Sequence, residues 1–519
     1  MKILLLLLAL PAAAQTPETI TVDAAARLGP LKPVWAYFGY DEPNYSYTAN
    51  GTKLISELAA ASARPVYIRT HNLLTTGDGT PALKWGSTNA YTEDSAGRPV
   101  YDWAIVDRIF DTYVHAGAKP FVEIGFMPKA LSIHPEPYQH SWPKTKIAAG
   151  WAFPPSDYGK WSELVSQWVQ HSVERYGKAE VESWYWEVWN EPDIEYWQGT
   201  PAEYNKLYDA AVEAVKRALP TARVGGPATT GPADPKGAAF LRQFLAHCAE
   251  GHPLDFISYH AKGKPEVIDG HVRMGLEKQL ADVRRGLEVI ADFPQFRKLP
   301  VILSESDPEG CAACSARTHP PNAYRNGALY ASYTAAAMRS ILDLAAERGA
   351  PVDGMLTWAF EFEGQPYFDG FRTLATNGID KPVLNFFRMA GLMGGDRLGV
   401  TRSGVVDALA ARTEREVSVL LWNFNADDVP GAAAPVALHI ANLPSRVLVT
   451  HYRIDGEHSN AYTAWQAMGS PQNPTAEQYR ALGAAGQLQL LEAPHWVNGS
   501  ATLTFDLPRQ GVSLVQLSW

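Results

Sequence analysis

Two glutamates stand out because each one ends a short apolar run. Residues 183–190 are rich in Trp and lead directly into Glu191 and Pro192. The proline has no N–H to give to a sheet, so a strand here must stop. A second apolar run, residues 300–305, ends in Glu305. Barrel enzymes keep their chemistry at the carboxyl ends of their strands, and a pair of carboxylates there can flank a glycosidic bond.

The surroundings of each glutamate predict its role. Glu191 is expected to be the acid/base, because nearby negative charge and apolar neighbours raise the pKa of such a carboxyl. Glu305 is expected to be the ionised nucleophile, and Arg69, at the end of an earlier strand, is the candidate to keep it charged. A lone glutamate is more often a surface carboxylate, but two in matched positions after buried strands favour the catalytic interpretation.

The elements that must position these glutamates alternate between strand and helix. Eight short apolar runs are each followed by an amphipathic segment, a pattern typical of parallel strands that are buried on both faces. The predicted strands are residues 34–39, 66–70, 120–126, 183–190, 222–226, 254–260, 300–305 and 354–360. The alternation predicts a (β/α)8 TIM barrel, in which the ends of strands four and seven face each other across the mouth. A doubly wound sheet is the alternative, but no glycine-rich phosphate turn follows the first strand.

The helical period stops after about Arg397, and turn-bounded strands follow. They are predicted at residues 417–422, 436–440, 447–453, 488–491, 501–505 and 512–517. We therefore expect a C-terminal all-β sandwich domain, joined by a lone strand at residues 19–22. The predicted division is a barrel at residues 32–396 and a sandwich made of residues 15–31 and 397–519.

Residues 1–14 are typical of a secretory signal peptide. Lys2 is followed by the apolar run 3–10, and Ala12 to Ala14 offer a small-residue cleavage site. The chain is therefore predicted to be exported to the periplasm or the extracellular space. No later segment has some eighteen consecutive apolar residues, so no membrane span is expected. The net charge of −10 and the lack of a basic run argue against nucleic acid as a partner.

The three cysteines suggest a disulfide rather than a metal site. In an exported protein Cys311 and Cys314 could close a small bridge. A zinc site would need more ligands, and no second cysteine pair exists. A redox role ranks last, because the pair lies in a loop bounded by Gly and Pro, and Cys248 is expected to be a buried free thiol. No metal and no cofactor are predicted.

The motif Trp-Asn-Glu-Pro at residues 189–192, together with Glu305 on strand seven, resembles glycoside hydrolases that carry both catalytic carboxylates on these strands. With Val-Gly-Gly-Pro at residues 224–227 and the barrel-plus-sandwich plan, the chain resembles glycoside hydrolase family 39, the β-xylosidases and α-L-iduronidases. The resemblance implies that Glu191 is the acid/base and Glu305 the nucleophile of a retaining enzyme. It also implies that Asn190 hydrogen-bonds the sugar 2-OH.

Several segments are similar to α-L-iduronidase: residues 68–71, residues 255–260 with the following Lys-Gly, residues 305–308 and residues 370–374. This similarity implies site roles for His71, His260, Lys262 and Arg372. Lys262 and Arg372 could together bind a carboxylate at C5 of the sugar, one as a point charge and the other as a fork.

The chain also departs from the iduronidase pattern. Residues 101–105 stand where that pattern has a histidine, and its acidic residue on the eighth-strand loop maps to Glu361 or Glu363. The β-xylosidases of the family tend to carry His-x-Tyr-Gly on strand six. Trp358 on strand eight either fills the barrel or forms a platform under the sugar.

The sequence therefore predicts an exported retaining exo-glycosidase that releases terminal sugars of xylo configuration. Among these sugars it favours a uronic acid. A β-D-xylosidase acting on xylo-oligosaccharides is the alternative. A non-catalytic carbohydrate-binding protein would be expected to lack one glutamate, and both are present. An endo-acting enzyme would need a long open cleft, whereas closure by the loops at 75–102 and 128–155 would favour exo action. The expected partner is a glycoside or oligosaccharide, and the oligomeric state is left open.

Overall fold

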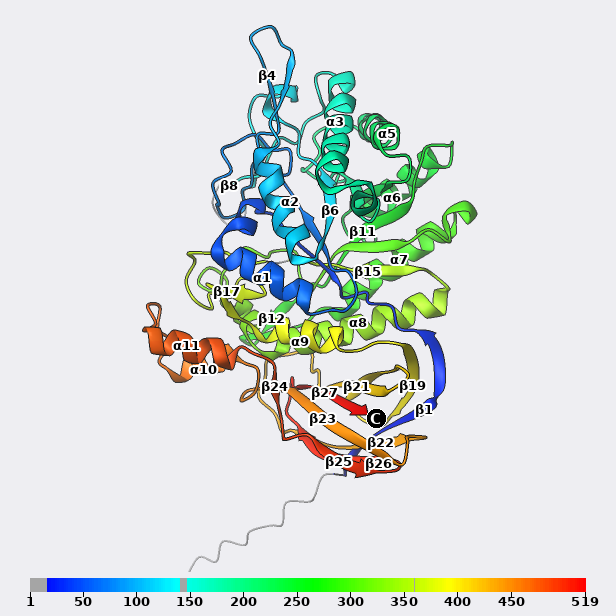
Figure 1. The fold of residues 1–519 in the computed structure, drawn as a ribbon, viewed down its shortest axis with the longest axis vertical. Helices are drawn as coiled ribbons and strands as arrows, with labels where there is room; N and C mark the ends of the chain where they lie inside the picture. Colours follow the sequence, from blue (N-terminus) through cyan, green and yellow to red (C-terminus); the bar gives the residue numbers. More distant parts are fainter. Residues whose placement is uncertain (1–15, 141–146, 359) are drawn as a thin grey trace, which may run out of the picture.

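The computed structural model describes residues 16–140, 147–358 and 360–519, so the predicted signal peptide at 1–14 lies outside the described residues. Figure 1 shows a barrel surrounded by helices and, beside it, a separate domain built mainly of strands. The strands of the barrel are β2 (Tyr37–Tyr40), β3 (Tyr67–Thr70), β6 (Lys119–Ile124), β9 (Tyr185–Val188), β10 (Arg223–Thr229), β11 (Phe256–Lys262), β14 (Val301–Asp307), β15 (Val352–Met355) and β16 (Thr357–Trp358).

All neighbouring strands of this sheet are parallel, and the sheet closes on itself. β15 pairs with β14 and β16 pairs with β2, so the eighth strand is made of two consecutive pieces. The predicted (β/α)8 barrel is confirmed. Parallel order places the carboxyl ends of all strands at one mouth, which is where the predicted site residues must gather.

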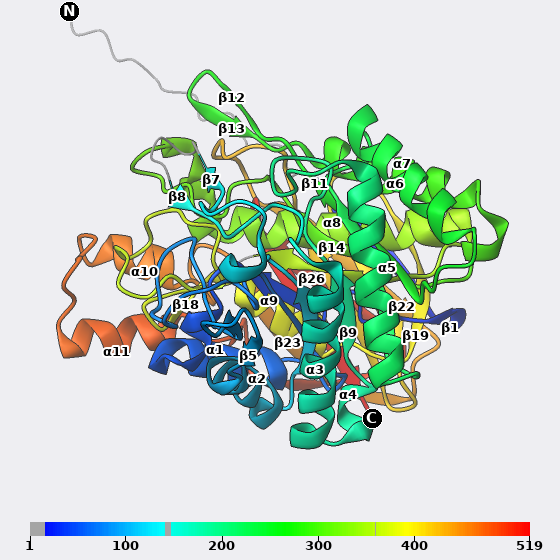
Figure 2. The same cartoon turned by 90° about the horizontal axis from the view of Figure 1, so that it is seen from above.

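Helices α1 to α9 surround the barrel (Figure 2). They are α1 (Ala49–Ala60), α2 (Ala104–Ala116), α3 (Tyr158–Tyr176), α4 (Lys178–Val181), α5 (Pro201–Ala218), α6 (Pro235–Cys248), α7 (Leu276–Ala291), α8 (Ala328–Arg348) and α9 (Pro382–Gly391). Local signals set their ends. Thr200 and Glu203 form a capping box at the start of α5, with Pro201 in its first turn, and α2 ends at Gly117, whose φ of 85° suits a residue without Cβ. Within the described residues, no helix is both long and apolar enough to cross a membrane.

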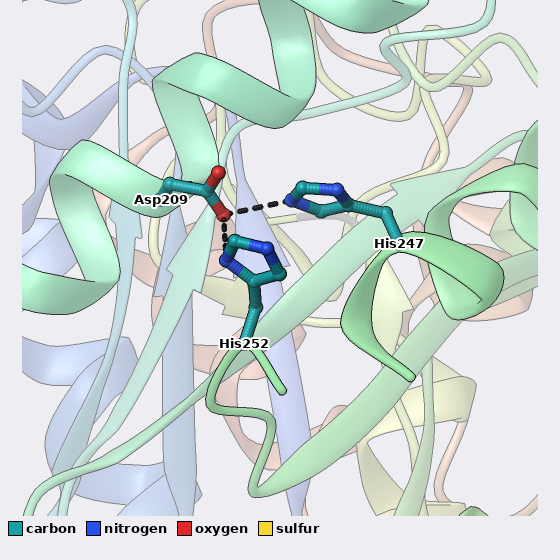
Figure 3. Close-up of side chains that lie close together, drawn as sticks. All are labelled: Asp209, His247 and His252. Atoms are coloured by element: carbon teal, nitrogen blue, oxygen red, sulfur yellow. Dashed lines mark hydrogen bonds and ion pairs between the residues drawn. The ribbon is translucent and has the colours of Figure 1, made fainter. Parts of the chain in front are cut away.

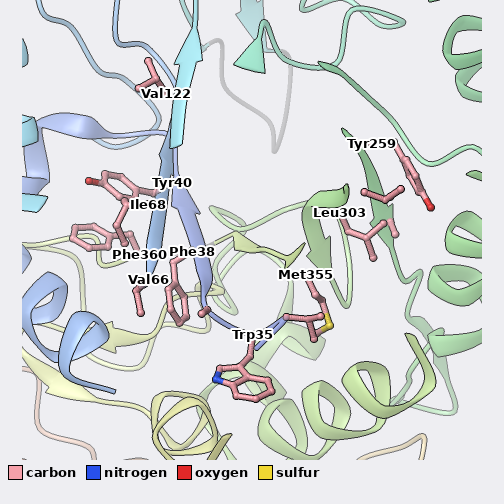
Figure 4. Packing of buried hydrophobic residues seen from close by; sticks show 14 of the residues in the cluster. Trp35, Phe38, Tyr40, Val66, Ile68, Val122, Tyr259, Leu303, Met355 and Phe360 are labelled. Carbon is pink, nitrogen blue, oxygen red and sulfur yellow. The ribbon is translucent and has the colours of Figure 1, made fainter. Parts of the chain in front are cut away.

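Successive residues of each barrel strand point to opposite sides, and the two sides have different roles. Outward side chains such as Phe38, Ile68 and Val122 join the large core beneath the helices (Figure 4). Inward side chains form an aromatic and aliphatic layer that fills the barrel; it contains Tyr37, Phe121, Tyr185, Phe256, Ile302, Leu356 and Trp358. Glu187 stands two residues after Tyr185 and therefore on the same inward side, one layer nearer the mouth.

The second domain contains a ten-stranded sheet within the described residues. Its strands are β1 (Glu18–Pro30), β19 (Asp396–Arg402), β20 (Asp407–Arg412), β21 (Glu416–Trp422), β22 (Ala434–Ala441), β23 (Arg446–Ile454), β24 (Gln489–Leu490), β25 (His495–Asn498), β26 (Ala501–Leu507) and β27 (Val512–Ser518). β1 lies between β19, its antiparallel neighbour, and β22, its parallel neighbour, so the two ends of the chain share one sheet. Residues from both halves of the sheet, such as Val436 and Val515, enclose one apolar core.

Two helices in this domain were not predicted. α10 (Ala461–Ala467) and α11 (Ala476–Ala485) lie between β23 and β24, so the expectation of strands alone after Arg397 is wrong for this segment. The helices are short, but their capping residues can be recognised in the sequence. Asn460 caps α10, and Thr475 forms a capping box with Gln478 at the start of α11. Their apolar side chains pack with Phe368 of the barrel loop that precedes α9.

Short hairpins and 3-10 helices complete the loops. The hairpins are β4 (Tyr91–Glu93) with β5 (Pro99–Tyr101), β7 (Gln139–His140) with β8 (Ile147–Ala148), β12 (Glu266–Ile268) with β13 (His271–Arg273), and β17 (Ala375–Thr376) with β18 (Ile379–Asp380). The 3-10 helices are η1 (Pro43–Tyr47), η2 (Lys129–Leu131), η3 (Pro294–Phe296) and η4 (Pro320–Asn326).

Candidate active site

Glu191 and Glu305 face each other at the mouth of the barrel. Glu191 follows β9 and Glu305 lies near the end of β14. One carboxylate oxygen of each glutamate and a ring nitrogen of His260 all lie within 4.8 Å of one another. Retaining glycosidases keep their two carboxyl groups about 5–5.5 Å apart, whereas inverting enzymes need about 6.5–9.5 Å. The separation seen here fits the retaining arrangement.

The turn that carries Glu191 is held in an uncommon backbone conformation. Trp189 and Glu191 have φ values of 72° and 42°, in the left-handed region that side chains other than glycine rarely adopt. The N–H of Glu191 donates to the carbonyl of Ala228 at 2.9 Å, and the N–H of Thr230 donates to Asp193 Oδ1 at 2.9 Å. The loops after β9 and β10 thus fix each other, and with them the direction of the Glu191 side chain.

Arg69 is fully buried and connects four polar side chains at the mouth. Its Nε donates to Glu187 Oε2 at 2.5 Å, and its Nη2 lies 3.0 Å from Glu123 Oε2. Nη2 also donates to Asn190 Oδ1 at 3.1 Å, while Nη1 lies 3.4 Å from Glu305 Oε1. The structure therefore brings Arg69, Asn190 and Glu305 together. Asn190 Nδ2 has no hydrogen-bond partner within the described residues, which leaves a donor beside the glutamates.

His71 supplies a second cation beside Glu305. Its Nδ1 lies 2.6 Å from Asp41 Oδ1, and its Nε2 lies 3.0 Å from Glu123 Oε2 and 3.6 Å from Glu305 Oε1. Burial lowers the pKa of His71, but the carboxylates of Glu123 and Asp41 outweigh it and raise the pKa to about 9. At neutral pH the ring is therefore protonated, and it favours the ionised form of Glu305.

Lys262 and His260, both on β11, lie between the two glutamates. His260 Nδ1 is 2.8 Å from Glu191 Oε1 and 3.7 Å from Glu305 Oε2. The Lys262 ammonium lies 3.5 Å from Glu191 Oε1 and makes a closer ion pair with Glu305 Oε2. Burial lowers the pKa of Lys262, but the two glutamates reverse this and hold it above its usual value, so the lysine stays charged.

The pKa of Glu191 corrects an expectation. We expected it to be raised, and burial does act in that direction, as does the charge of Glu305. The Lys262 ammonium and the hydrogen bond from His260 outweigh both, and the pKa of Glu191 is lowered. For Glu305 burial again raises the pKa, but His260, Lys262, His71 and Arg69 together hold it well below its usual range. The sequence showed the carboxylates but not the cation placed between them.

Arg372 lies behind the mouth rather than in it. The guanidinium is fully buried, 3.3 Å from Asp307 Oδ2 and 2.9 Å from Glu309 Oε1, and its Nε donates to the carbonyl of Trp358 at 3.1 Å. Two protein carboxyl groups thus pair with it, and Glu309 Oε1 also lies 3.1 Å from Arg325 Nη2. Asp307 in turn is so deeply buried that its pKa is raised to about 7 despite Arg372.

Trp358 and Glu363, the two candidates on and after the eighth strand, occupy different places. Trp358 is 4% exposed, its ring centroid lies 4.1 Å from that of His71, and it fills the space beside Gly39, where a Cβ would lie 2.5 Å from the indole. It therefore supports the mouth from below. Glu363 lies on the loop after β16, near Tyr45 and Glu361, and its Oε2 has no hydrogen-bond partner within the described residues. The structure does not bring Glu363 to the facing glutamates.

A cavity of about 840 Å³ opens beside Glu191 and Lys262. Its wall is made of loops after β9, β10, β11 and β14, and includes Ile194, Thr230, Lys264, Pro265, Val267, Val272, Glu309, Cys311, Cys314, His319 and Arg325. Cys311 and Cys314 form a disulfide in this wall. Arg273, at the end of the β12–β13 hairpin, pairs with Asp427 of the sheet domain, so the second domain supports one side of the cavity.

Four charged residues of the mouth were not predicted from the sequence. Asp41 follows β2 as Glu191 follows β9, so its position on a strand end was a usable signal. Glu123 and Glu187 are single carboxylates inside apolar strands, a pattern that indicates a buried ion pair. Lys84, which pairs with Asp41, comes from a long loop and carries no signal in the sequence.

Comparison with known proteins identifies the family of the chain. The model of the family described as "Glycosyl hydrolases family 39" matches residues 18–499. A β-xylosidase of Geobacillus stearothermophilus is 29% identical over 471 residues, covering 87% of this chain and 86% of that protein. An α-L-iduronidase of Mus musculus is 25% identical and covers 98% of this chain and 82% of that protein.

Among solved structures, a monomeric β-xylosidase of Caulobacter crescentus superposes with a TM-score of 0.78 at 24% identity, covering 96% of this chain and 99% of that chain. This likeness supports the fold. The family model supports the resemblance inferred from the Trp-Asn-Glu-Pro motif and Glu305. The chain belongs to glycosyl hydrolases family 39 and is a glycosidase.

Proposed function

We propose that the protein is a retaining exo-glycosidase that removes a terminal sugar of xylo configuration by double displacement. The observation that carries this proposal is the facing pair Glu191 and Glu305, whose oxygens approach within 4.8 Å while cations hold Glu305 ionised. A Glu305 oxygen attacks C1, the bond from C1 to the leaving oxygen breaks, and Glu191 gives that oxygen a proton. Water then attacks C1 of the glycosyl-enzyme, Glu191 takes the proton from the water, and the bond from C1 to the Glu305 oxygen breaks to restore the carboxylate.

To act as the acid, Glu191 must be protonated, but its pKa is lowered in the enzyme without substrate. Its contact with Lys262, at 3.5 Å, is longer than the ion pair between Lys262 and Glu305. A sugar that enters between the carboxylates separates Glu191 from the ammonium and excludes water from it. Burial and the charge of Glu305 both raise the pKa of Glu191, and they would then be opposed by His260 alone. Substrate binding itself thus prepares the acid.

Asn190 is placed to bind the hydroxyl next to the reacting carbon. Its Oδ1 is held by Arg69 at 3.1 Å, which fixes the amide, and its Nδ2 is buried with no partner among the described residues. A sugar 2-OH can accept this N–H, and such a contact strengthens in the transition state. Arg69 therefore acts through Asn190 and Glu305 rather than on the sugar.

A terminal β-D-xyloside is the substrate class that the geometry supports best. Arg372 is fully buried and paired with Asp307 and Glu309, and Lys262 is paired with both glutamates, so neither side chain is without a partner before a C5 carboxylate arrives. The β-xylosidase is also somewhat more similar to this chain than the α-L-iduronidase is, at 29% against 25% identity. A terminal α-L-iduronide is the second candidate, favoured by Lys262, which lines the cavity and keeps 19% of its side chain exposed.

Exo action is proposed from the cavity beside Glu191, which in the described part of the chain is lined by no residue of the loops at 75–102 and 128–155. A volume of about 840 Å³ is typical of sites that enclose a small ligand. Its wall of Pro265, Val267, Val272 and the disulfide would contact the leaving group. The proposal of exo action is tested by the product pattern on a reduced xylo-oligosaccharide: single sugars released from the non-reducing end support it, and internal cleavage contradicts it.

The mechanism is tested with Glu305→Ala and Glu191→Ala on an aryl β-D-xyloside and an aryl α-L-iduronide. Glu305→Ala should abolish turnover, and azide should restore it by forming a glycosyl azide of inverted configuration. Glu191→Ala should slow poor leaving groups far more than an activated aryl group, because only the former need the acid. Glu347→Ala, an exposed glutamate on α8, is the matched control. Near-full activity in Glu305→Ala would show that the nucleophile is another residue.

We further propose that the protein is exported. The leader-like residues 1–14 and a disulfide between Cys311 and Cys314 both suit an oxidising compartment. Expression of the full chain in a bacterium, followed by fractionation and N-terminal sequencing, tests this. A periplasmic product that begins near Gln15 supports export, and an uncleaved cytoplasmic product contradicts it.

A further inference from the structure

Three side chains that can bind metal ions converge far from the active site. Asp209 lies on α5, His247 in the last turn of α6, and His252 in the loop that leads to β11. His247 Nε2 and His252 Nδ1 each lie 2.8 Å from Asp209 Oδ1, and both rings direct these nitrogens at the carboxylate (Figure 3). The two imidazole rings stack, with centroids 3.9 Å apart.

This cluster is independent of the catalytic machinery. His252 precedes β11, whereas His260 and Lys262, which contact the glutamates, lie at the other end of the same strand. A strand rises about 3.3 Å per residue, so the cluster and the mouth are at opposite faces of the barrel. In barrels of this type the amino-terminal face serves stability rather than catalysis.

The donor set is that of a transition-metal site. We propose that Asp209, His247 and His252 bind a divalent transition-metal ion, with Zn²⁺ as the best match. Two imidazole nitrogens and one carboxylate oxygen are a common three-ligand set for zinc, with water as the fourth ligand. All three side chains are partly exposed, between 16% and 31%, so water can reach the open position.

The spacing of the donors allows this geometry. The three donor atoms lie within 4.8 Å of one another. Tetrahedral bonds of about 2.0–2.1 Å separate neighbouring ligand atoms by roughly 3.3 Å. The two nitrogen–oxygen distances of 2.8 Å must therefore widen by about half an ångström, a change that rotation of partly exposed side chains can supply.

The cluster at Asp209 differs from the active site in having no bound cation of its own among the described side chains. The other described group with this donor type, Glu191, His260 and Glu305, already has a cation between its carboxylates, the ammonium of Lys262. At Asp209 no lysine or arginine is paired with the carboxylate in the described part of the chain. A metal ion bound there would join α5, the end of α6 and the loop before β11, and it would stabilise the barrel between strands four and six.

The sequence predicted no metal site because its ligands come from separate segments. His247 and His252 are five residues apart, and Asp209 precedes His247 by 38 residues (247 − 209), a spacing that matches no familiar zinc motif. Only the packing of α5 against α6 brings the carboxylate to the imidazoles.

The test measures zinc binding directly on the full chain without an affinity tag. Protein freed of metal by a chelator is dialysed against ZnCl₂, and bound zinc is measured by mass spectrometry in the wild type, His247→Gln, His252→Gln and the double variant. His171→Gln is the matched control, because His171 also joins two helices by pairing with one aspartate, Asp107, at 2.7 Å.

We expect one zinc per chain in the wild type and in His171→Gln, and binding weakened by about tenfold or more in each cluster variant. ZnCl₂ should raise the unfolding temperature of the wild type and of His171→Gln but not that of the double variant. Substituted Co²⁺ should show the intense visible bands of tetrahedral coordination. Equal zinc binding by the wild type and the double variant, or none by the wild type, would overturn the proposal.

Discussion

The ammonium of Lys262 lies between the two glutamates, so removing its charge tests the electrostatics of the site directly. Lys262→Met keeps most of the side-chain length and deletes the charge. The ammonium is 3.5 Å from Glu191 Oε1 and closer to Glu305 Oε2. At 3.5 Å the attraction between unit charges is about 1 kcal/mol in the dielectric of water and about 5 kcal/mol at an effective dielectric constant of 20. Even the smaller figure amounts to about one pH unit in a protonation equilibrium.

The sign follows from the pKa directions. Lys262 lowers the pKa of both Glu191 and Glu305, so deleting it should raise both. In a profile of kcat/KM against pH, the acid limb reports the ionisation of the nucleophile and the alkaline limb reports the loss of the proton from the acid. Both limbs of Lys262→Met should therefore move to higher pH, by about one unit or more.

The assay is the pH profile of aryl β-D-xyloside hydrolysis by the wild type, Lys262→Met and Lys264→Met. Lys264 is exposed and lines the same cavity two residues further on, so its removal controls for a general loss of positive charge. Its variant should keep both limbs in place. Limbs that stay fixed in Lys262→Met while the rate falls would refute the reasoning, because the lysine would then act by position and not by charge.

Three further predictions concern stability and the cavity wall. Arg69→Met should lower the free energy of unfolding by about 3–5 kcal/mol, because it leaves the buried Glu187 without its cation and Glu123 with His71 alone. Urea unfolding beside the exposed Arg108→Met measures this loss. A matching loss in Arg108→Met would contradict it. Burial and the adjacent Asp41 raise the pKa of Glu42 to about 8, so its contribution to stability is present below about pH 4.3 and is lost as the pH rises through 8. Glu42→Gln should flatten this fall in urea midpoints between pH 5 and pH 9, and an unchanged slope would contradict it. Cys311→Ser with Cys314→Ser should lower the free energy of unfolding by about 2 kcal/mol, because the disulfide closes a short loop. The double variant should also raise KM more than it lowers kcat, because the carbonyl of Cys314 accepts N–H groups from Asn322 and Arg325 in the cavity wall. Wild type reduced by a thiol should behave like this variant, and a fall in kcat alone would contradict it.

The barrel and its facing glutamates could be predicted because they depend on patterns that are local in the sequence. A buried parallel strand has a continuous apolar sequence, and a residue that follows it in a barrel lies at the mouth. Glu191, Glu305 and Arg69 were found in this way. Asp41 obeys the same rule after β2 and was overlooked.

What could not be predicted depends on distances across the fold. The sequence shows a lysine two residues after His260, but not that its ammonium lies between two carboxylates, and this reverses the expected pKa shift of Glu191. It shows Arg372 near the end of the barrel, but not that Asp307 and Glu309 already pair with it. The metal-binding cluster at Asp209 likewise exists only through the packing of α5 on α6.

The charge balance at the mouth bears on which sugar the site accepts. A cation strengthens the binding of a C5 carboxylate only if it is not already paired with a protein carboxylate. Exchanging one carboxylate partner for another yields little net attraction. Lys262 could bind such a group only by leaving Glu191, its longer contact, and this is the same separation that prepares Glu191 as the acid. With a uronide bound, the Lys262 ammonium would thus pair with the C5 carboxylate of the sugar. With a xyloside bound, it would pair with Glu305 alone. If Lys262→Met abolishes turnover of the iduronide while the xyloside profile only shifts to higher pH, the lysine serves both purposes. If both substrates respond only by the shift in pH, the lysine tunes the glutamates and does not recognise the sugar.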